Sequence, residues 1–326
     1  MKQFNKILCV VEPDESSEAA VIQALKIAND HQAQITFASI LGKVDTWNML
    51  FKKEAEVNEN ISDCSVLKLA AVKNWLKAFD LAKHTDVKIY TGIGFIDTVT
   101  DVIKNDFDLV VKCAEDVDWL DRLFASDDMH LLRKCPCPVL MLKPTQKNVF
   151  RNVMATVDVN NEHTDLKVNR VQNELNISVL DYSTTFSLSE LTELHVCSVW
   201  DAFGESHLRY SAFSTSSEDT VDRYVEEIRH EYSDKLRRLI SNSNSSISKD
   251  AADYLKPKIH LVKGDPSQQI PLMANTYNID LIVMGTVART GLPGFIIGNT
   301  AESILEQVKC SVLAIKPDGF VTPVTV

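Results

Sequence analysis

The sequence lacks the markers of several protein classes. No segment of the 326-residue chain approaches the roughly 20 apolar residues that a helix needs to cross a bilayer, and residues 1–11 hold one short apolar run rather than a signal peptide. Glycine is absent from VEPDESS at 11–17 and VDVNNEH at 157–163, two loops that follow predicted strands, so the dinucleotide-binding fingerprint is missing. We therefore expect a cytoplasmic protein without a membrane span, and a dehydrogenase is disfavoured.

Neither the cysteines nor the basic residues form a recognisable pattern. The seven cysteines are scattered and odd in number, which suits reduced thiols. Cys135 and Cys137 form a lone C-P-C that could supply half a metal site, but no matching Cys or His pair follows, so buried thiols are favoured and no metal is predicted. The net charge is −11, and no basic stripe with interleaved aromatics occurs, which argues against DNA or RNA as a partner.

Familiar catalytic motifs are missing too. The chain has no G-x-S-x-G, H-E-x-x-H, P-loop or recognisable Cys-His spacing, and its eight histidines show no metal-ligand spacing. We expect a protein that is not an enzyme, although slow ATP hydrolysis stays compatible with the sequence.

An internal repeat is the clearest positive feature. FDLVVKCAEDVDWLDRLFASDD at 107–128 matches IDLIVMGTVARTGLPGFIIGNT at 279–300, and each leads into a short helix and then PVLMLKP or SVLAIKP. The same number of residues separates Asp108 from Ser126 and Asp280 from Gly298, so the two loops align without a gap. The N-terminal parts of the two halves correspond as well, because residues 5–20 align with residues 151–166. The chain is therefore a duplicated domain.

Each half alternates short apolar β-branched runs with helical segments, the pattern of a parallel sheet with helical crossovers. The predicted strands are 6–11, 34–40, 87–91, 108–112 and 139–143, then 152–157, 193–199, 258–262, 280–284 and 311–316. A long helix is predicted from Glu218 to Ser241, where apolar residues at spacings of three and four mark one buried face. The fold class is α/β, with two tandem doubly wound five-stranded parallel sheets.

The predicted domains are residues 1–147 and 148–326, because Pro144–Lys147 punctuates the chain and leads directly into the second half. A linker this short requires the halves to pack against each other.

The run from Ile279 to Thr300 joins a buried strand to a glycine-bearing loop and a new helix. Its glycines allow tight turns and close approach to a ligand, and the helix beginning near Thr300 directs unpaired N–H groups at the same space. This is where a phosphate could sit.

The loop, its preceding strand and the fivefold βα alternation together resemble the universal stress protein family over essentially the whole chain. Nucleotide-binding members carry a glycine, two residues, a second glycine, nine residues, then a third glycine and a Ser or Thr. Gly285 and Gly298 match, whereas Ala288 replaces the second glycine and Asn299 the hydroxyl residue. The resemblance implies an adenine nucleotide alpha hydrolase-like fold with strand order 3-2-1-4-5, and ATP or another adenine nucleotide as ligand.

The resemblance also implies contacts residue by residue. Asp158 and Val196 match positions near the adenine and ribose, Met284 would sit beside the base, and Gly285 would lie beneath the sugar and phosphates. The phosphate side of the predicted site consists of Arg289, Gly298, Asn299 and Thr300.

Plainer interpretations compete at several of these positions. Asn299 and Glu302 have the spacing of a capping box, so Asn299 could simply cap the helix. Asp158 could be a solvated turn residue, and Arg289 an ordinary surface arginine. Val196 and Met284 would read as core residues without the motif.

The first half departs from the pattern. Ser126, Asp127 and Asp128 stand where the second half has Gly298, Asn299 and Thr300, and Cys113 replaces Gly285. The loop between carries Glu115, Asp116, Asp118 and Asp121, which repel an anion, so the first half should not bind ATP in the family manner.

The function expected from these features is a stress-response protein that binds an adenine nucleotide in its second half and acts on an unknown protein client. Two alternatives stay open: a scaffold that binds no nucleotide, and a carrier of a larger, partly apolar ligand between the halves. Family members pair through their last strands, which predicts an internal pseudo-twofold pairing of Val139–Lys143 with Ser311–Lys316 and leaves a further homodimer possible.

Overall fold

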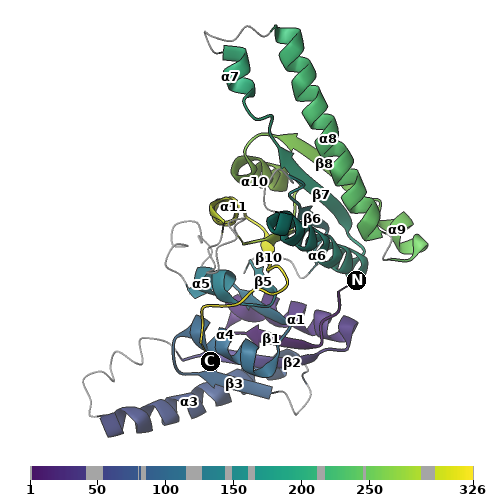
Figure 1. The fold of residues 1–326 in the computed structure, drawn as a ribbon. Helices are drawn as coiled ribbons and strands as arrows, with labels where there is room; N and C mark the ends of the chain where they lie inside the picture. Colours follow the sequence, from purple (N-terminus) through teal and green to yellow (C-terminus); the bar gives the residue numbers. More distant parts are fainter. Residues whose placement is uncertain are drawn as a thin grey trace.

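The computed structural model describes most of the chain (Figure 1). The described residues are 2–41, 54–79, 81, 86–114, 127–143, 149–160, 166–210, 217–244, 247–287 and 298–325. All structural statements below refer to these ranges. The predicted linker Pro144–Lys147, and with it the boundary between the two proposed domains, lies outside them.

The first half contains five strands and the helices that connect them. Its elements are β1 (Lys6–Val10), α1 (Glu18–His31), β2 (Gln34–Ile40), α3 (Glu54–Leu76), β3 (Asp86–Tyr90), α4 (Gly94–Asn105), β4 (Leu109–Cys113), α5 (Asp127–Lys134) and β5 (Val139–Leu142). Short 3₁₀ turns at Glu15–Ser17 and Lys77–Phe79 complete this half.

The second half repeats this order and adds helices between β7 and β8. Its elements are β6 (Asn152–Thr156), α6 (Leu166–Glu190), β7 (Glu193–Trp200), α7 (Glu205–Tyr210), α8 (Glu218–Asn244), α9 (Lys249–Leu255), β8 (Lys258–Lys263), α10 (Pro266–Thr276), β9 (Leu281–Gly285), α11 (Asn299–Gln307) and β10 (Ser311–Ile315). All ten predicted strands are present.

The ten strands form one continuous sheet in the order β3-β2-β1-β4-β5-β10-β9-β6-β7-β8. Within each half the order is 3-2-1-4-5 and the pairing is parallel, as the sequence predicts. The strands β5 and β10 pair antiparallel and join the two five-stranded sheets into one. Leu313 lies opposite Leu140 in this pairing, which confirms the expected match of the two last strands.

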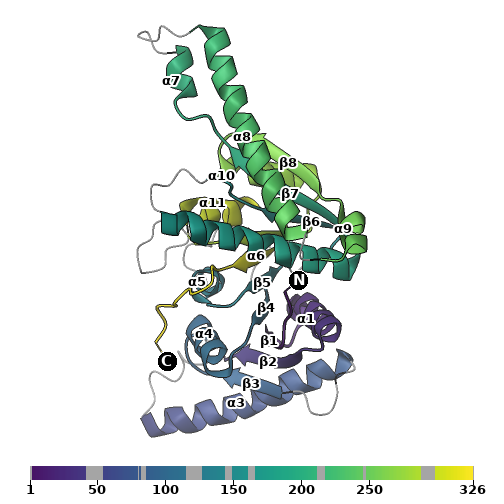
Figure 2. The same cartoon turned by 45° about the vertical axis from the view of Figure 1, so that its right-hand side comes forward.

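Helices cover both faces of the sheet, and a separate apolar cluster lies under each layer (Figure 2). Successive residues of a strand point to opposite faces of the sheet. In β1, Ile7 and Cys9 belong to the cluster that is covered by α1, α3, α6 and α8. Leu8 and Val10 belong to the cluster that is covered by α4, α5, α10 and α11. Both clusters contain residues from each half. The two halves therefore share their hydrophobic cores across the β5–β10 pairing.

A second contact between the halves lies on the α1 face. The Phe4 ring stacks on Tyr182 of α6 with ring centroids 5.6 Å apart. Beside it the Lys26 ammonium lies 3.0 Å from the Glu190 carboxylate. The halves are thus held together through both their sheet edges and their helices.

Helix α8 confirms the predicted long helix and its buried face. Val221, Tyr232 and Leu236 are buried at helical spacing. Figures 1 and 2 show α7 and one end of α8 extending beyond β8, the strand at the outer edge of this half. The Arg209 guanidinium joins α7 to α8 through an ion pair with Asp222 at 2.6 Å.

Lys316, directly after β10, is a buried cation between the halves. Its ammonium donates hydrogen bonds to the Leu132 carbonyl of α5 and to the Thr286 hydroxyl, which follows β9. Burial lowers the pKa of Lys316 from its ordinary 10.5 to about 8, and the nearby Cys135 and Cys137 oppose this shift.

We expect Leu313→Ala to destabilise the whole molecule by about 2–5 kcal/mol, because Leu313 is fully buried where the two halves pair. Urea unfolding measures the loss, and exposed Leu191→Ala, which should cost under ~0.5 kcal/mol, is the control. A loss for Leu313→Ala no larger than the control's would contradict the observed pairing.

The lowered pKa of Lys316 predicts a specific pH dependence. Between pH 8 and 10.5 the unfolded chain holds a proton that the folded protein releases, so stability relative to Lys316→Met should rise with pH in this window. The expected slope is up to about 1.4 kcal/mol per pH unit, measured as the difference in unfolding free energy between the two proteins. A difference that stays flat from pH 7.5 to 10 would show that Lys316 titrates normally.

Candidate functional site

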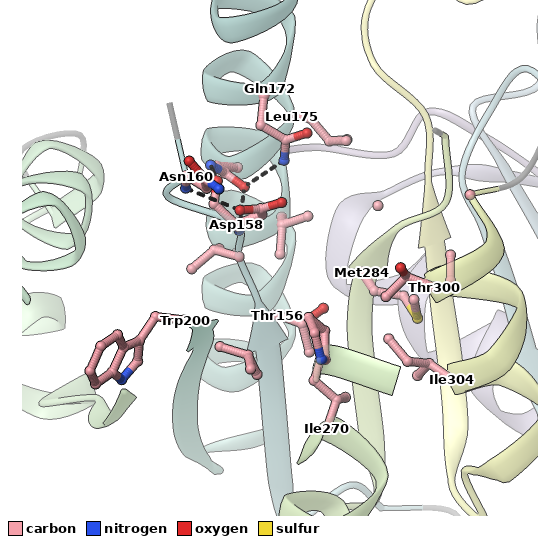
Figure 3. A pocket seen from close by; sticks show the side chains of 18 of the residues that line it. Thr156, Asp158, Asn160, Gln172, Leu175, Trp200, Ile270, Met284, Thr300 and Ile304 are labelled. Atoms are coloured by element: carbon pink, nitrogen blue, oxygen red, sulfur yellow. Dashed lines mark hydrogen bonds between the residues drawn. The ribbon is translucent and has the colours of Figure 1, made fainter. Parts of the chain in front are cut away.

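A cleft of about 750 Å³ opens at the carboxyl ends of the second half's strands (Figure 3). It lies where β6 and β9 are neighbours and their crossovers leave in opposite directions, the switch point at which doubly wound sheets bind ligands. The walls come from the ends of β6, β7 and β9, from α6, from the start of α10 and from the start of α11.

Six of the eight predicted site residues line this cleft: Asp158, Met284, Gly285, Gly298, Asn299 and Thr300. Val196 does not line it, because its side chain points into the core within β7 and is fully buried. Arg289 and Ala288 lie outside the described residues.

Asp158 is held in place by Asn176 of α6. The Asp158 N–H donates to the Asn176 side-chain oxygen at 3.0 Å, and the Asn176 amide donates back to the Asp158 carbonyl at 2.7 Å. The Gln172 amide donates to the same Asn176 oxygen at 3.2 Å, and the Asp158 carboxylate accepts from the Asn160 N–H at 3.0 Å. A buried amide thus fixes the backbone at the end of β6 and orients the carboxylate at the cleft.

Gly285 lies in close contact with a side chain of α6. A Cβ at this position would lie 2.5 Å from the Leu175 side chain of α6, which occupies the space that the glycine leaves. The sequence interpretation placed the sugar and phosphates over Gly285, whereas Leu175 covers part of that surface. The cleft remains open beside both residues.

The start of α11 differs by one residue from the predicted cap. Gly298 is the N-cap, with φ −62° and ψ 136°, and Asn299 is the first helical residue. The capping-box interpretation of Asn299 with Glu302 is therefore wrong, and Glu302 instead forms an ion pair with Arg133 of α5. Gly298, Asn299 and Thr300 line the cleft, and the first-turn N–H groups of α11 have no intrahelical acceptor. The Gly298 N–H donates to the Thr286 carbonyl at 3.2 Å.

Aromatic side chains form the opposite end of the cleft. Trp200, Phe203 and Tyr232 line it, and Phe203 is 89% exposed. Figure 3 shows Trp200 on the far side from Met284, Thr300 and Ile304. The sequence analysis missed this wall, although an aromatic residue at the end of a predicted strand was a usable signal.

The corresponding region of the first half is occupied by an internal ion pair. The Lys112 ammonium lies 2.6 Å from the Asp128 carboxylate, and both side chains are buried. In the repeat these positions correspond to Met284 and Thr300. Glu12, the counterpart of Asp158, pairs with Lys68 of α3. The predicted acidic loop containing Glu115, Asp116, Asp118 and Asp121 lies outside the described residues.

Comparison with known proteins agrees with the duplicated architecture. The model of the universal stress protein family matches residues 3–143 and again residues 180–316. The chain belongs to the universal stress protein family. It carries the family domain twice, which confirms the resemblance drawn from the sequence.

Several known proteins match this chain along nearly their whole length. The chain is similar to the universal stress protein E homolog of Haemophilus influenzae, with 26% identity covering 97% of this chain and 98% of the relative. Universal stress protein E of Escherichia coli K12 is 25% identical over 99% and 98% of the two chains. Among solved structures, the functionally unknown protein PA1789 of Pseudomonas aeruginosa has a TM-score of 0.67 at 23% identity, covering 97% of this chain and 93% of that one.

Within the described residues no helix has the length and apolar content to cross a membrane. The same part of the chain contains no group of three or more His, Cys, Asp or Glu side chains arranged to hold a metal ion.

Asn176→Leu should destabilise the protein by about 1–3 kcal/mol, because it leaves the Asp158 N–H and carbonyl without their partner. Gln172→Leu, which removes only one hydrogen bond from a half-buried residue, is the matched control and should cost less. Urea unfolding compares the two. Equal losses would mean that Asn176 does not fix the end of β6 as described.

Proposed function

We propose that the cleft of the second half binds an adenine nucleotide, and that the protein acts in the cytoplasm through this binding in a regulatory or protective role rather than as a catalyst. The observation that carries the proposal is the start of α11. A helix N-terminus with a glycine cap borders an open cleft at the switch point of a doubly wound sheet. Family membership supports the same assignment.

The residues of the cleft suit different parts of a nucleotide. The amides at Asn299 and Thr300, with the Thr300 hydroxyl, are suited to phosphate oxygens. The Asp158 carboxylate, held by its backbone contacts with Asn176, is suited to accept hydrogen bonds from ribose hydroxyls. Apolar side chains such as Met284 and Val199 offer a surface for the base.

The first half is assigned a supporting role. Asp128 stands at the start of α5, where the second half would place the phosphate, and it is neutralised by the protein's own Lys112. An entering anion would have to displace this buried pair. We therefore propose that only the second half binds nucleotide and that any client protein responds to its state.

A carrier function between the halves has less support. The cavity between α1 and α6, which belong to different halves, holds about 10 Å³, room for a single water molecule. A scaffold that binds no nucleotide remains the competing hypothesis, and the experiment below separates it from ours.

ATP should raise the thermal midpoint of the wild-type protein, because a ligand that binds only the folded state stabilises it. Gly298→Asp should abolish this shift. The backbone at Gly298 suits any residue, and Asp is a good N-cap, so the variant should fold while placing a carboxylate at the phosphate position. Thermal unfolding and isothermal titration calorimetry with ATP measure both effects.

Gly298→Asn is the matched control, because it has the same size and capping ability without the charge. It should retain at least part of the ATP response. No thermal shift of the wild type at millimolar ATP would refute nucleotide binding and favour the scaffold. Equal loss in the Asp and Asn variants would show that the negative charge is not responsible.

A further inference from the structure

An ion pair connects the first half to the helix that borders the cleft. Arg133 lies in the last turn of α5 and Glu302 in the first turn of α11, and the guanidinium contacts the carboxylate. The two side chains are 23% and 16% exposed, so solvent screens the pair only partly. The contact crosses between the halves next to the β5–β10 pairing.

Glu302 carries a negative charge close to the place where we put the phosphates. It belongs to the same helical turn as Asn299 and Thr300, which line the cleft. A second carboxylate, Glu306, follows one turn later. Burial and the Glu302 charge raise the pKa of Glu306, and Arg133 opposes that shift. The positive charge of Arg133 therefore acts on both Glu302 and Glu306.

The pair has no counterpart in the repeat. We aligned α5 and α11 by their first residues. Arg133 of α5 then corresponds to Leu305 of α11, and Glu302 of α11 corresponds to His130 of α5. Duplication alone would therefore not produce this contact. The ion pair distinguishes the two copies, and its acidic member Glu302 belongs to α11, the helix that borders the cleft.

We propose that Arg133 is a positioning residue for anion binding in the other half: by neutralising Glu302, it lets the start of α11 present a net positive field to the phosphates. Without Arg133 the carboxylate would counter the helix dipole and the amides at the same turn. The inference rests on the proposed function, since it assigns part of the phosphate affinity to a residue of the half that is not proposed to bind the nucleotide.

The test is a double-variant cycle in which calorimetry measures the affinity of each variant for ATP and for adenosine. Arg133→Ala should weaken ATP binding on the order of tenfold, while adenosine, which has no phosphate, should bind as in the wild type. Arg133→Ala with Glu302→Gln should restore ATP affinity, because the carboxylate is then absent as well. Arg133→Lys should rescue much of the loss. Arg229→Ala, on α8 and half exposed, is the control for removing one positive charge.

The outcomes separate this inference from the proposed function. If wild type fails to bind ATP, the proposed function itself fails. If wild type binds ATP and Arg133→Ala binds equally well, the inference is overturned. It is also overturned if adenosine affinity falls in parallel with ATP affinity, or if Glu302→Gln does not restore Arg133→Ala, because either result indicates a merely structural contact. Circular dichroism of each variant confirms that it is folded before affinities are compared.

Discussion

The antiparallel pairing of β5 with β10 is the interaction on which the rest of the structure depends. Each strand would otherwise be an open edge of a five-stranded sheet, and each is buried along its whole length. Their pairing extends both apolar clusters through the two halves. It also brings α5 beside α11, so that a side chain of one half reaches the helix that borders the other half's cleft.

The two copies of the domain have the same strand order but differ in chemistry at the switch point. At the switch point of the second half, Gly298 and the first turn of α11 border open space. In the first half the matching region holds Lys112 and Asp128, which satisfy each other. The place proposed for an anion is therefore open in the second half, whereas the first half holds the carboxylate of Asp128 there. One copy supports the structure while the other retains a site for the proposed ligand.

Much of the fold could be predicted from the sequence, because short buried strands and a repeat are local patterns. The ten strands and the buried face of α8 follow from them, whereas the strand order and the pairing of the last strands were implied by the family resemblance. The site was harder. Asn176 and Leu175 reach the cleft from a helix distant in sequence from the glycine-bearing loop, and no local pattern marks them. The cap of α11 was misplaced by one residue because Asn299 and Glu302 have capping-box spacing, while the tertiary pair with Arg133 takes Glu302 instead.

The outer strand β8 shows how the sheet stops growing at that end. Its sequence begins with Lys258 and ends with Lys263, and Ile259 between them is about half exposed. The Lys258 ammonium pairs with Glu193 at 2.6 Å, and Lys263 pairs with Glu205 of α7, so both charges are anchored at the rim. A strand from another molecule that docked there would have to desolvate two ammonium groups. The lysines thus disfavour the addition of a strand from another molecule at this edge of the sheet.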